Sequence, residues 1–207
     1  MTSEEKVYGP YTQALEKVRE DIVGRINACC EKEKLNTGNK VVEHIESRIK
    51  DPESMAEKCR RKGLEETPKN ALREIRDSVG VRIVCDFIDD IYLNVDYIRE
   101  FQGCRVVEEK DYIRGAKPNG YRSYHMILEL IEPFEDVDGN MPGRWFVEVQ
   151  LRTIAMDTWA ALEHEMKYKT EVKNQNLIES ELKRCADELA SCDVSLQTIR
   201  NLIREGN

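Results

Sequence analysis

The stretch RWFVEVQLRT, residues 144–153, predicts a strand at the centre of the fold. Its apolar and polar side chains alternate, and successive side chains of a strand point to opposite faces of a sheet. One face would carry Trp145, Val147, Val149 and Leu151. The other would carry Phe146, Glu148, Gln150 and Arg152. We expect the first face to lie in the core and the second to be polar and able to do chemistry.

The stretch YRSYHMILELI, residues 121–131, predicts a partner for this strand. Between the two lies DVDGNMPG, residues 136–143, whose turn-forming residues indicate an antiparallel hairpin. Alternation places Tyr121, Ser123 and His125 on one face, which would extend the polar face of residues 144–153. An ordinary solvent-facing side of an antiparallel sheet accounts for this pattern equally well.

The rest of the chain predicts an alternation of helices and strands. Helices are expected over residues 4–34, 39–49 and 52–63, around Leu72, and over residues 89–101, 153–169 and 174–204. Asp51 and Pro52 read as the N-cap and first position of the third of these. Further strands are expected over residues 79–87 and 104–113. The predicted fold class is α/β (α+β), a mixed sheet flanked by helices, with long N- and C-terminal helices.

Composition bounds the function. The chain has 207 residues, 40% of them hydrophobic, which suffices for one domain with helical extensions. No apolar run is long enough to cross a bilayer and the N-terminus does not resemble a secretory signal, so we expect a soluble, cytoplasmic protein without a membrane partner. The net charge of −8 argues against broad nucleic-acid binding, so any site for a polyanion must be local.

One short segment, RIKDPESMAEKCRRK, residues 48–62, gathers basic side chains. Charge runs are most often solvated helix faces, but in an acidic chain such a cluster favours a pocket for phosphates. Asp77 stands just before a predicted strand, where it could meet Glu148 from a neighbouring strand. Alone, Asp77 could be a turn residue and Glu148 a surface carboxylate. Together they would offer the hard oxygen ligands that Mg²⁺ prefers.

Several motifs carry a family resemblance. RIKDPESMAEKCRRKG, DSVGVRIVCDF, KPNGYRSYH and EVQLRT followed by WAALEHEMKYK resemble, in order and spacing, the synthetase domain of the RelA/SpoT family. Over residues 41–169 the chain looks like a single-domain small alarmone synthetase. The resemblance implies a nucleotidyltransferase-like fold. It also implies transfer of the β,γ-pyrophosphate of ATP to the 3′-hydroxyl of GDP or GTP, with GMP as a further acceptor, in the stringent response.

The resemblance also implies residue roles. ATP would be bound by Arg48, Lys50, Ser54, Lys58, Arg61, Arg82 and Lys110, with Arg48 and Arg82 sandwiching the adenine. GDP or GTP would be bound by Lys117, Asn119, Tyr121, His125 and Gln150, with Tyr121 stacking on guanine. Asp77 and Glu148 would hold Mg²⁺, and Glu148 would orient or deprotonate the attacking hydroxyl. Ser54 could instead only cap a helix, and Tyr121 could be a half-buried strand tyrosine.

The division of the chain follows from these motifs. We expect an N-terminal helical extension over residues 1–38, the synthetase domain over 39–172, and a C-terminal helix over 173–207. In the motif with Trp159, Glu163, His164 and Tyr168 we expect a structural helix behind the sheet. The last helix carries an apolar seam with heptad spacing, made of Leu182, Cys185, Leu189, Cys192, Leu196, Ile199 and Ile203. It predicts either packing onto its own domain or an oligomer contact, and the resemblance implies a tetramer.

Hydrolysis and allosteric activation are separate questions. The histidines are His44, His125 and His164, none followed by Asp, so we expect synthesis without the hydrolase activity of longer family members. Some tetrameric members are activated by a second alarmone through an aromatic residue and a threonine. Here His44 and Glu46 stand in those places, which puts such activation in doubt.

Two other functions stay open. A toxin-type branch of the family pyrophosphorylates the 3′ end of tRNA, which the net charge disfavours but a local basic track would allow. A non-catalytic regulator that binds nucleotide or RNA is the second. The presence of both Asp77 and Glu148 argues against it, and RNA also remains a candidate regulator of an enzyme.

Overall fold

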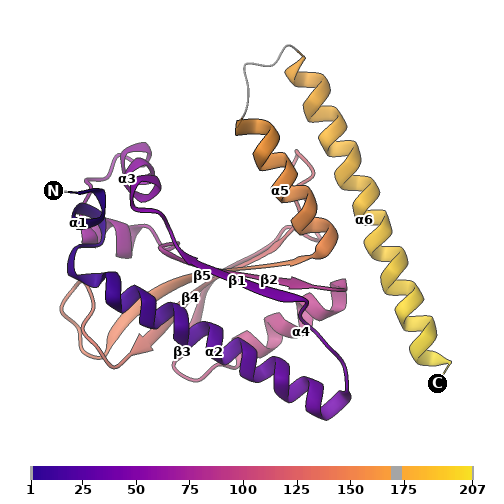
Figure 1. Cartoon of the computed structure of the whole chain (residues 1–207), viewed down its shortest axis with the longest axis horizontal. Helices are drawn as coiled ribbons and strands as arrows, with labels where there is room; N and C mark the ends of the chain where they lie inside the picture. Colours follow the sequence, from indigo (N-terminus) through magenta and orange to yellow (C-terminus); the bar gives the residue numbers. More distant parts are fainter. Residues whose placement is uncertain (1, 169–173, 207) are drawn as a thin grey trace.

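The computed structural model describes residues 2–168 and 174–206, and their strands form one five-stranded mixed sheet flanked by helices (Figure 1). The strands are β1 (His44–Ile49), β2 (Val79–Cys85), β3 (Cys104–Asp111), β4 (Tyr124–Glu132) and β5 (Gly143–Thr153), in the order β1-β2-β5-β4-β3. β2 and β5 are parallel, and the other neighbours are antiparallel. The predicted fold class and the β4–β5 hairpin are confirmed.

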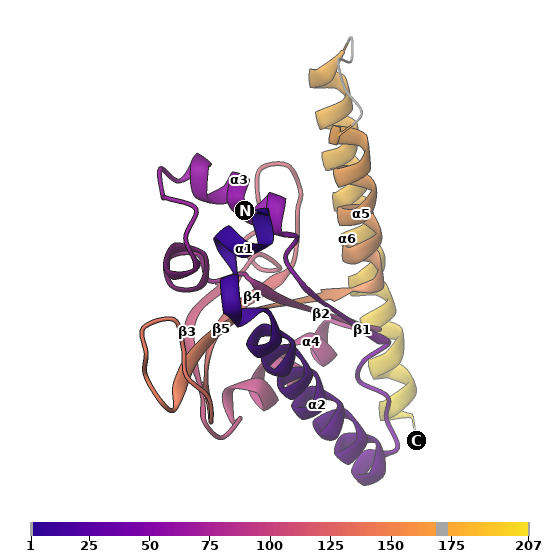
Figure 2. The same ribbon diagram turned by 60° about the vertical axis from the view of Figure 1, so that its left-hand side comes forward.

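The helices leave one face of the sheet partly open. They are α1 (Ser3–Val7), α2 (Thr12–Thr37), α3 (Pro52–Arg61), α4 (Ile88–Arg99), α5 (Ile154–Tyr168) and α6 (Gln175–Glu205), with a 3₁₀ turn η1 (Gly9–Tyr11) and a π turn η2 (Asn70–Glu74). α2 and α4 cover one side of the sheet, whereas α3 and α5 rise on the other (Figures 1 and 2). Lys169 and the expected boundary at residues 172–173 lie outside the described residues.

The core forms between α2, α4 and the sheet. α2 contributes a stripe at spacings of three and four, formed by Leu15, Val18, Ile22 and Ile26, each at most 2% exposed. β5 contributes Val147, Val149 and Leu151, which are fully buried as its alternation predicted. Burying one such side chain stabilises the fold by roughly 1.5–3 kcal/mol, so this layer fixes β5 in the middle of the sheet.

Residues 44–49 form strand β1, so the prediction of a helix over residues 39–49 is wrong. Val41, Ile45 and Ile49 have helical spacing, which misled the prediction. β1 is an edge strand that pairs antiparallel with β2. Its alternate residues Ile45 and Ile49 pack against the core while Glu46 and Arg48 take the opposite face. The predicted cap of α3 is confirmed, because the Asp51 carboxylate accepts a hydrogen bond from the Ser54 amide at 3.0 Å.

Strand β4 begins later than predicted. It starts at Tyr124, so Tyr121 and Ser123 belong to the segment before it. Ser123 is fully buried and its hydroxyl donates to the Leu151 carbonyl at 3.2 Å. The expectation that Ser123 shares an open polar face with Tyr121 and His125 is therefore wrong, because its hydroxyl satisfies a buried backbone group instead.

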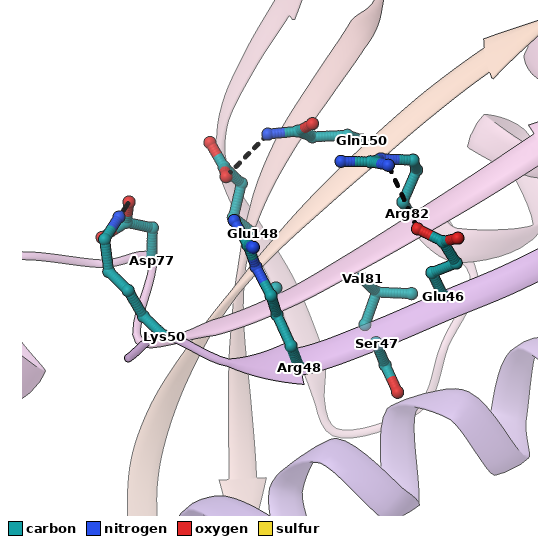
Figure 3. A pocket seen from close by; sticks show the side chains of 10 residues that line it. Glu46, Ser47, Arg48, Lys50, Asp77, Val81, Arg82, Glu148 and Gln150 are labelled. Atoms are coloured by element: carbon teal, nitrogen blue, oxygen red, sulfur yellow. Dashed lines mark hydrogen bonds and ion pairs between the residues drawn. The ribbon is translucent and has the colours of Figure 1, made fainter. Parts of the chain in front are cut away.

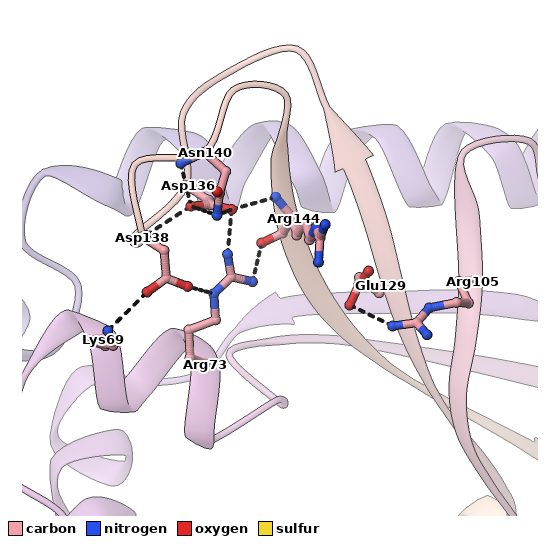
Figure 4. Close-up of polar contacts among 8 residues, drawn as sticks. All are labelled: Lys69, Arg73, Arg105, Glu129, Asp136, Asp138, Asn140 and Arg144. Atoms are coloured by element: carbon pink, nitrogen blue, oxygen red, sulfur yellow. Dashed lines mark hydrogen bonds and ion pairs between the residues drawn. The ribbon is translucent and has the colours of Figure 1, made fainter.

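The loop between β4 and β5 is held by a compact polar cluster (Figure 4). The Asp136 carboxylate accepts hydrogen bonds from the backbone amides of Asp138, Asn140 and Arg144, at 2.9, 3.1 and 2.9 Å. Arg73 of η2 donates to the carboxylates of Asp136 and Asp138 and, at 2.8 Å, to the Arg144 carbonyl. This cluster, here called the hairpin latch, ties the hairpin to the segment that leads into Asp77.

Helix α6 docks on its own domain through polar contacts. The Thr153 hydroxyl, at the end of β5, donates to Asp193 at 2.6 Å. Arg200 donates to both oxygens of Asp90 in α4 at 2.7 and 2.6 Å. The Trp159 indole donates to the Leu182 carbonyl at 2.8 Å. None of the helices in the described part of the chain combines the length and the apolar character that a membrane crossing requires.

Candidate active site

The sheet register lines up two rows of side chains on its open face. The first row runs across the strands as Arg48, Gly80, Glu148, Ile127 and Glu108. The second runs as Glu46, Arg82, Gln150, His125 and Lys110. Paired residues of neighbouring strands share a face, so residues distant in sequence meet here. Gly80 has no side chain, which leaves a hollow between Arg48 and Glu148.

Two cavities meet over these rows. The first is called the donor-side cavity because it holds Arg48 and Arg82, which the sequence predicts to bind ATP. Its volume is about 470 Å³, and it is lined by Glu46, Ser47, Arg48, Lys50, Asp77, Gly80, Val81, Arg82, Glu148 and Gln150 (Figure 3). The second is called the acceptor-side cavity because it holds His125, which the sequence predicts to bind the acceptor. Its volume is about 310 Å³, and it is lined by Lys58, Lys62, Glu74, Ile75, Arg76, Asp77, Glu108, Lys110, His125, Ile127 and Glu148. Asp77 and Glu148 line both, so the two carboxylates form the shared wall.

Asp77 lies between two lysines. Its Oδ2 accepts hydrogen bonds from Lys50 Nζ at 2.7 Å and from Lys58 Nζ at 2.5 Å. Burial alone would raise the pKa of Asp77, but these two ammonium groups outweigh burial and lower the pKa below its ordinary value. Oδ1 is buried and has no hydrogen-bond partner among the described residues. Asp77 therefore keeps one free, negatively charged ligand atom.

Glu148 is held by its neighbours in the second row. Gln150 Nε2 donates to Glu148 Oε2 at 2.9 Å, and His125 Nδ1 lies 3.7 Å from Oε1. Burial would raise the pKa of Glu148, and so would the charge of Asp77. The contacts from His125 and Gln150 outweigh both and lower the pKa. At neutral pH the shared wall therefore carries two carboxylate anions.

Two arginines stand on the donor side of this wall (Figure 3). Arg82 donates to Glu46 at 3.1 Å, and its Nε lies 3.4 Å from Asp157 Oδ1. The side chain of Arg48 makes no hydrogen bond or ion pair with any residue that the structure describes. The guanidinium of Arg82 is held by carboxylates, whereas that of Arg48 is unpaired among the described residues. Both guanidinium groups are planar, so both are suited to stacking on an aromatic ring.

Aromatic rings gather next to the acceptor-side cavity, around its lining residue His125, whereas Tyr112, Tyr121 and Lys117 are not among the described residues that line either cavity. The Tyr121 hydroxyl lies 2.7 Å from His125 Nε2, and Tyr112 meets the His125 ring edge-on, with centroids 5.3 Å apart. Lys117 Nζ lies 4.4 Å from the centroid of Tyr112 and 4.7 Å from that of Tyr121. A cation over two rings marks this slot as a place where a flat or positively charged group can bind.

Some predicted residues lie outside the two cavities. Ser54 and Arg61 are not among the lining residues of either cavity in the described part of the chain. Asn119 accepts from the Tyr121 amide and donates to Glu163 at 3.1 Å, so its side chain links the turn to α5. Lys58 and Lys110, predicted to bind ATP, line the acceptor-side cavity and not the donor-side cavity. Gln150, predicted to bind the acceptor, lines the donor-side cavity and not the acceptor-side cavity.

Helix α5 lies on the side of the site, so the expectation that it supports the sheet from behind is wrong. The rings of Trp159 and Tyr121 are 6.5 Å apart, and Glu163 accepts the hydrogen bond from Asn119. His164 is exposed, and the side chain of Tyr168 lies outside the described residues. The helix was placed wrongly because its sequence does not tell which face of the sheet it crosses.

Sequence reasoning missed several residues of the site. Gly80 and Arg76 line the cavities without having been given a role, and Lys62 had been named only within the basic cluster of residues 48–62. Arg76 precedes Asp77 directly, and that position was the available signal. Alternation had placed Arg152 on the polar face, and the structure shows it in contact with Tyr121 and Gln150. Tyr112 gave no signal of its own because its strand was read only as part of the sheet.

Most of the sheet lies in a segment that matches a known protein family. The family described as the region found in RelA/SpoT proteins matches residues 47–173. The chain belongs to the RelA/SpoT family. The match covers most of the strands and both carboxylates of the shared wall, so the resemblance inferred from the sequence motifs is confirmed.

Individual members of the RelA/SpoT family agree. The chain is 42% identical to the GTP pyrophosphokinase YwaC of Bacillus subtilis over 153 residues, 72% of this chain and 70% of that protein. It is 31% identical to the GTP pyrophosphokinase YjbM of the same organism over 201 residues, 97% of this chain and 90% of that protein. The structure of small alarmone synthetase 1 from Bacillus subtilis, bound to its product pppGpp, has a TM-score of 0.76 at 29% identity and covers 94% of each chain.

Proposed function

We propose that this member of the RelA/SpoT family is a GTP pyrophosphokinase that makes ppGpp and pppGpp. It would transfer the β,γ-pyrophosphate of ATP to the ribose 3′-hydroxyl of GDP or GTP. The observation that carries the proposal is the shared wall of Asp77 and Glu148 between two cavities. A transfer between two nucleotides needs both to reach one anionic centre, and its catalysis is mostly positioning and charge neutralisation.

The donor-side cavity suits ATP. Arg48 and Arg82 would stack on the adenine from neighbouring strands, and Lys50 lines the same cavity next to Asp77. Lys58 lines the acceptor-side cavity and meets the same carboxylate from there, so the phosphates would reach both lysines at the shared wall. Both lysines already neutralise Asp77. Phosphate oxygens would draw them away from that carboxylate, since a polyphosphate carries more charge than one carboxylate.

The acceptor-side cavity suits a guanosine nucleotide. The slot between Tyr112 and Tyr121 holds Lys117 in this structure. Guanine stacking on Tyr121 would displace the Lys117 ammonium, which could then pair with the 5′-phosphates of the acceptor. Lys62 and Arg76 add positive charge at the same cavity. Gln150 would reach the ribose from beside Glu148.

Magnesium fits the shared wall. The free Oδ1 of Asp77 and the carboxylate of Glu148 are the hard oxygen ligands that Mg²⁺ takes, with phosphates and water to complete the shell. When bound, the ion would neutralise phosphate charge. Because Lys50 and Lys58 would repel a cation while they face Asp77, we expect Mg²⁺ to bind together with ATP rather than before it.

Glu148 would orient the attacking hydroxyl. Its lowered pKa keeps it ionised, so it can accept a hydrogen bond from the acceptor's 3′-hydroxyl, but a low pKa also makes it a weak base. Orientation therefore explains its role better than early removal of the proton. The loose transition state of phosphoryl transfer has little need of a strong base.

A labelling experiment tests this function. The purified protein is incubated with Mg²⁺, γ-labelled ATP and one acceptor at a time: GMP, GDP, GTP or deacylated tRNA. We expect label in a guanosine product. Label in tRNA alone would contradict the proposal in favour of the toxin-type reaction, and nucleotide binding without transfer to any acceptor would favour the regulator. Adding labelled ppGpp alone tests hydrolysis, and we expect it to stay intact.

The variant Glu148→Gln sharpens the test. The amide keeps the shape of the side chain and loses its charge, so transfer should fall by about a thousandfold or more, the scale expected for a group that acts in the transition state. ATP binding should remain measurable by calorimetry, since the donor-side arginines are unchanged. The matched control is Glu129→Gln, whose carboxylate pairs with Arg105 on β3. A fully active Glu148→Gln enzyme would remove Glu148 from the mechanism.

A further inference from the structure

Arg152 is a buried arginine on the site face of β5 without a role in the transfer described above. Its side chain is 7% exposed. Nη2 donates to the Tyr121 hydroxyl at 2.9 Å and to Gln150 Oε1 at 2.8 Å, and Nη1 donates to Asp157 Oδ1 at 2.9 Å. Its guanidinium also lies 5.3 Å from the centroid of the Tyr121 ring. One fork thus holds the predicted guanine-stacking ring and the neighbour of Glu148.

These contacts favour one direction for the hydrogen bonds around Glu148. Arginine can only donate, so the Tyr121 oxygen accepts from Arg152, and the Tyr121 proton stays available for donation to His125 Nε2. A neutral imidazole that accepts at Nε2 carries its proton on Nδ1, the nitrogen that faces Glu148. In the same way, donation to Gln150 Oε1 turns the amide nitrogen of Gln150 toward Glu148.

Asp157 connects this arrangement to the donor side. Its Oδ1 accepts from Arg152 and lies 3.4 Å from Nε of Arg82. The carboxylate is on the first turn of α5 and is half-buried, so the helix supplies a fixed anchor for both guanidinium groups. A chain of contacts therefore leads from Arg82 in one cavity through Asp157, Arg152 and Tyr121 to His125 in the other, and it does not pass through the shared wall.

We infer that Arg152 is a positioning residue that fixes Tyr121, His125 and Gln150 for the acceptor nucleotide, and that Asp157 anchors it and couples it to Arg82. The inference rests on the proposed function. Lysine could not replace Arg152, because its donors all lie on one nitrogen, whereas the guanidinium reaches Asp157 from Nη1 and Tyr121 and Gln150 from Nη2 in one planar fork.

The variant Arg152→Lys tests the inference by steady-state kinetics with each substrate varied in turn. Losing the direction of two charge-assisted hydrogen bonds should raise KM for GDP or GTP by about tenfold and change KM for ATP by less than about twofold. Asp157→Asn loosens both arginines and should raise both KM values. A merely structural role would lower the melting temperature and leave the ratio of the two KM values unchanged.

A second variant keeps the test valid if Arg152→Lys folds poorly. Tyr121→Phe retains the ring and removes the hydroxyl that Arg152 holds, so it should raise the acceptor KM by a few-fold. In the double variant the two effects should not add, because Tyr121 and Arg152 act through one hydrogen bond. Additive effects would overturn the inference.

The matched control is Arg200→Lys. It weakens the two hydrogen bonds from a largely buried arginine of α6 to Asp90, and Arg200 lines neither cavity. This variant should lower stability without changing the KM ratio. If the wild type transfers pyrophosphate and Arg152→Lys leaves the KM ratio unchanged, the inference fails alone. If the wild type transfers to no guanosine nucleotide, the proposed function fails, and the inference fails with it.

Discussion

Gly80 shapes the site because it has no side chain and so leaves space in the donor-side cavity. It lies between Arg48 and Glu148 in one row of the sheet, and it lines the donor-side cavity. A Cβ atom built there would have the Arg48 carbonyl oxygen as its nearest neighbour, 4.0 Å away, which is an ordinary contact. The fold therefore tolerates a side chain at this position, and only the volume available to a ligand would suffer.

The variant Gly80→Val should weaken ATP binding while the protein stays folded. Valine favours strands, so we expect no loss in melting temperature. Its branched side chain would fill space that the donor needs, and a loss of about tenfold in affinity corresponds to about 1.4 kcal/mol. Calorimetric titration with ATP measures the effect. Gly80→Ala should lose much less, and equal affinities for Gly80→Val and the wild type would show that the donor does not use this hollow.

The residues of the site differ in how far the sequence predicts them. Asp77 and Glu148 could be identified because the two carboxylates occur together with a basic cluster and match family motifs, although each alone has an ordinary explanation. Gly80 and Arg152 could not be given roles, because one acts through an absent side chain and the other through contacts with a helix and a loop. Such roles depend on which strands and helices become neighbours.

At the scale of elements, the hairpin latch fixes the approach to Asp77. Arg73 on η2 is bound to the loop between β4 and β5, and Asp77 follows η2 after two residues. Burial alone would raise the pKa of Asp136, but hydrogen bonds from the backbone of Arg144 and Asn140 outweigh it and hold the pKa well below the ordinary range. The ionised carboxylate therefore stabilises the folded state.

Asp136→Asn should destabilise the protein by about 3 kcal/mol at pH 7, because a buried carboxylate loses its charge and part of its hydrogen bonds. The folded pKa is lower than the unfolded value of about 3.9, so the stabilisation is present above about pH 4 and is lost as the pH falls below it. Urea unfolding at several pH values should show the two proteins converging in acid. Asp138→Asn, at a more exposed partner of Arg73, is the milder control. A constant difference between wild type and Asp136→Asn down to pH 3 would contradict this account.

The order of helices and strands was predictable because most of them show the spacing of apolar residues that is typical of a helix or of a strand. β5 alternates apolar and polar side chains from Val147 to Arg152, and α2 keeps its apolar stripe from Leu15 to Ile26. β1 was misread because an edge strand buries only one side, and Val41, Ile45 and Ile49 also fit a helix. What decided between the two was the pairing with β2, a contact between segments distant in sequence.

At the scale of the whole molecule, α6 presents an apolar surface to solvent. Of the predicted seam, Leu182 is buried against its own domain, whereas Leu196, Ile199 and Ile203 are 51%, 53% and 62% exposed. The helix therefore divides its apolar residues between two surfaces. Contiguous exposed apolar side chains are typical of protein interfaces, which supports the proposal that copies of the chain associate through α6.

The double variant Leu196→Glu with Ile203→Glu tests this association. Both side chains are exposed in the single chain, so the double variant should still fold. Association would bury the new glutamate charges between the copies, and the cost of that burial should disrupt the contact. Light scattering should show an oligomer for the wild type, with a tetramer expected, and a lower mass for the variant. Thr198→Glu, on another side of α6, should leave the mass unchanged. A monomeric wild type at micromolar concentration would contradict the proposal.

The shared wall bears on whether both substrates bind before the reaction takes place. Asp77 and Glu148 border both cavities, so in the proposed reaction donor and acceptor would occupy the enzyme at once, and no side chain would need to carry the pyrophosphate from one to the other. Initial-velocity plots with both substrates varied should therefore give intersecting lines, the signature of a ternary complex. Parallel lines would instead reveal a covalent carrier and a ping-pong cycle.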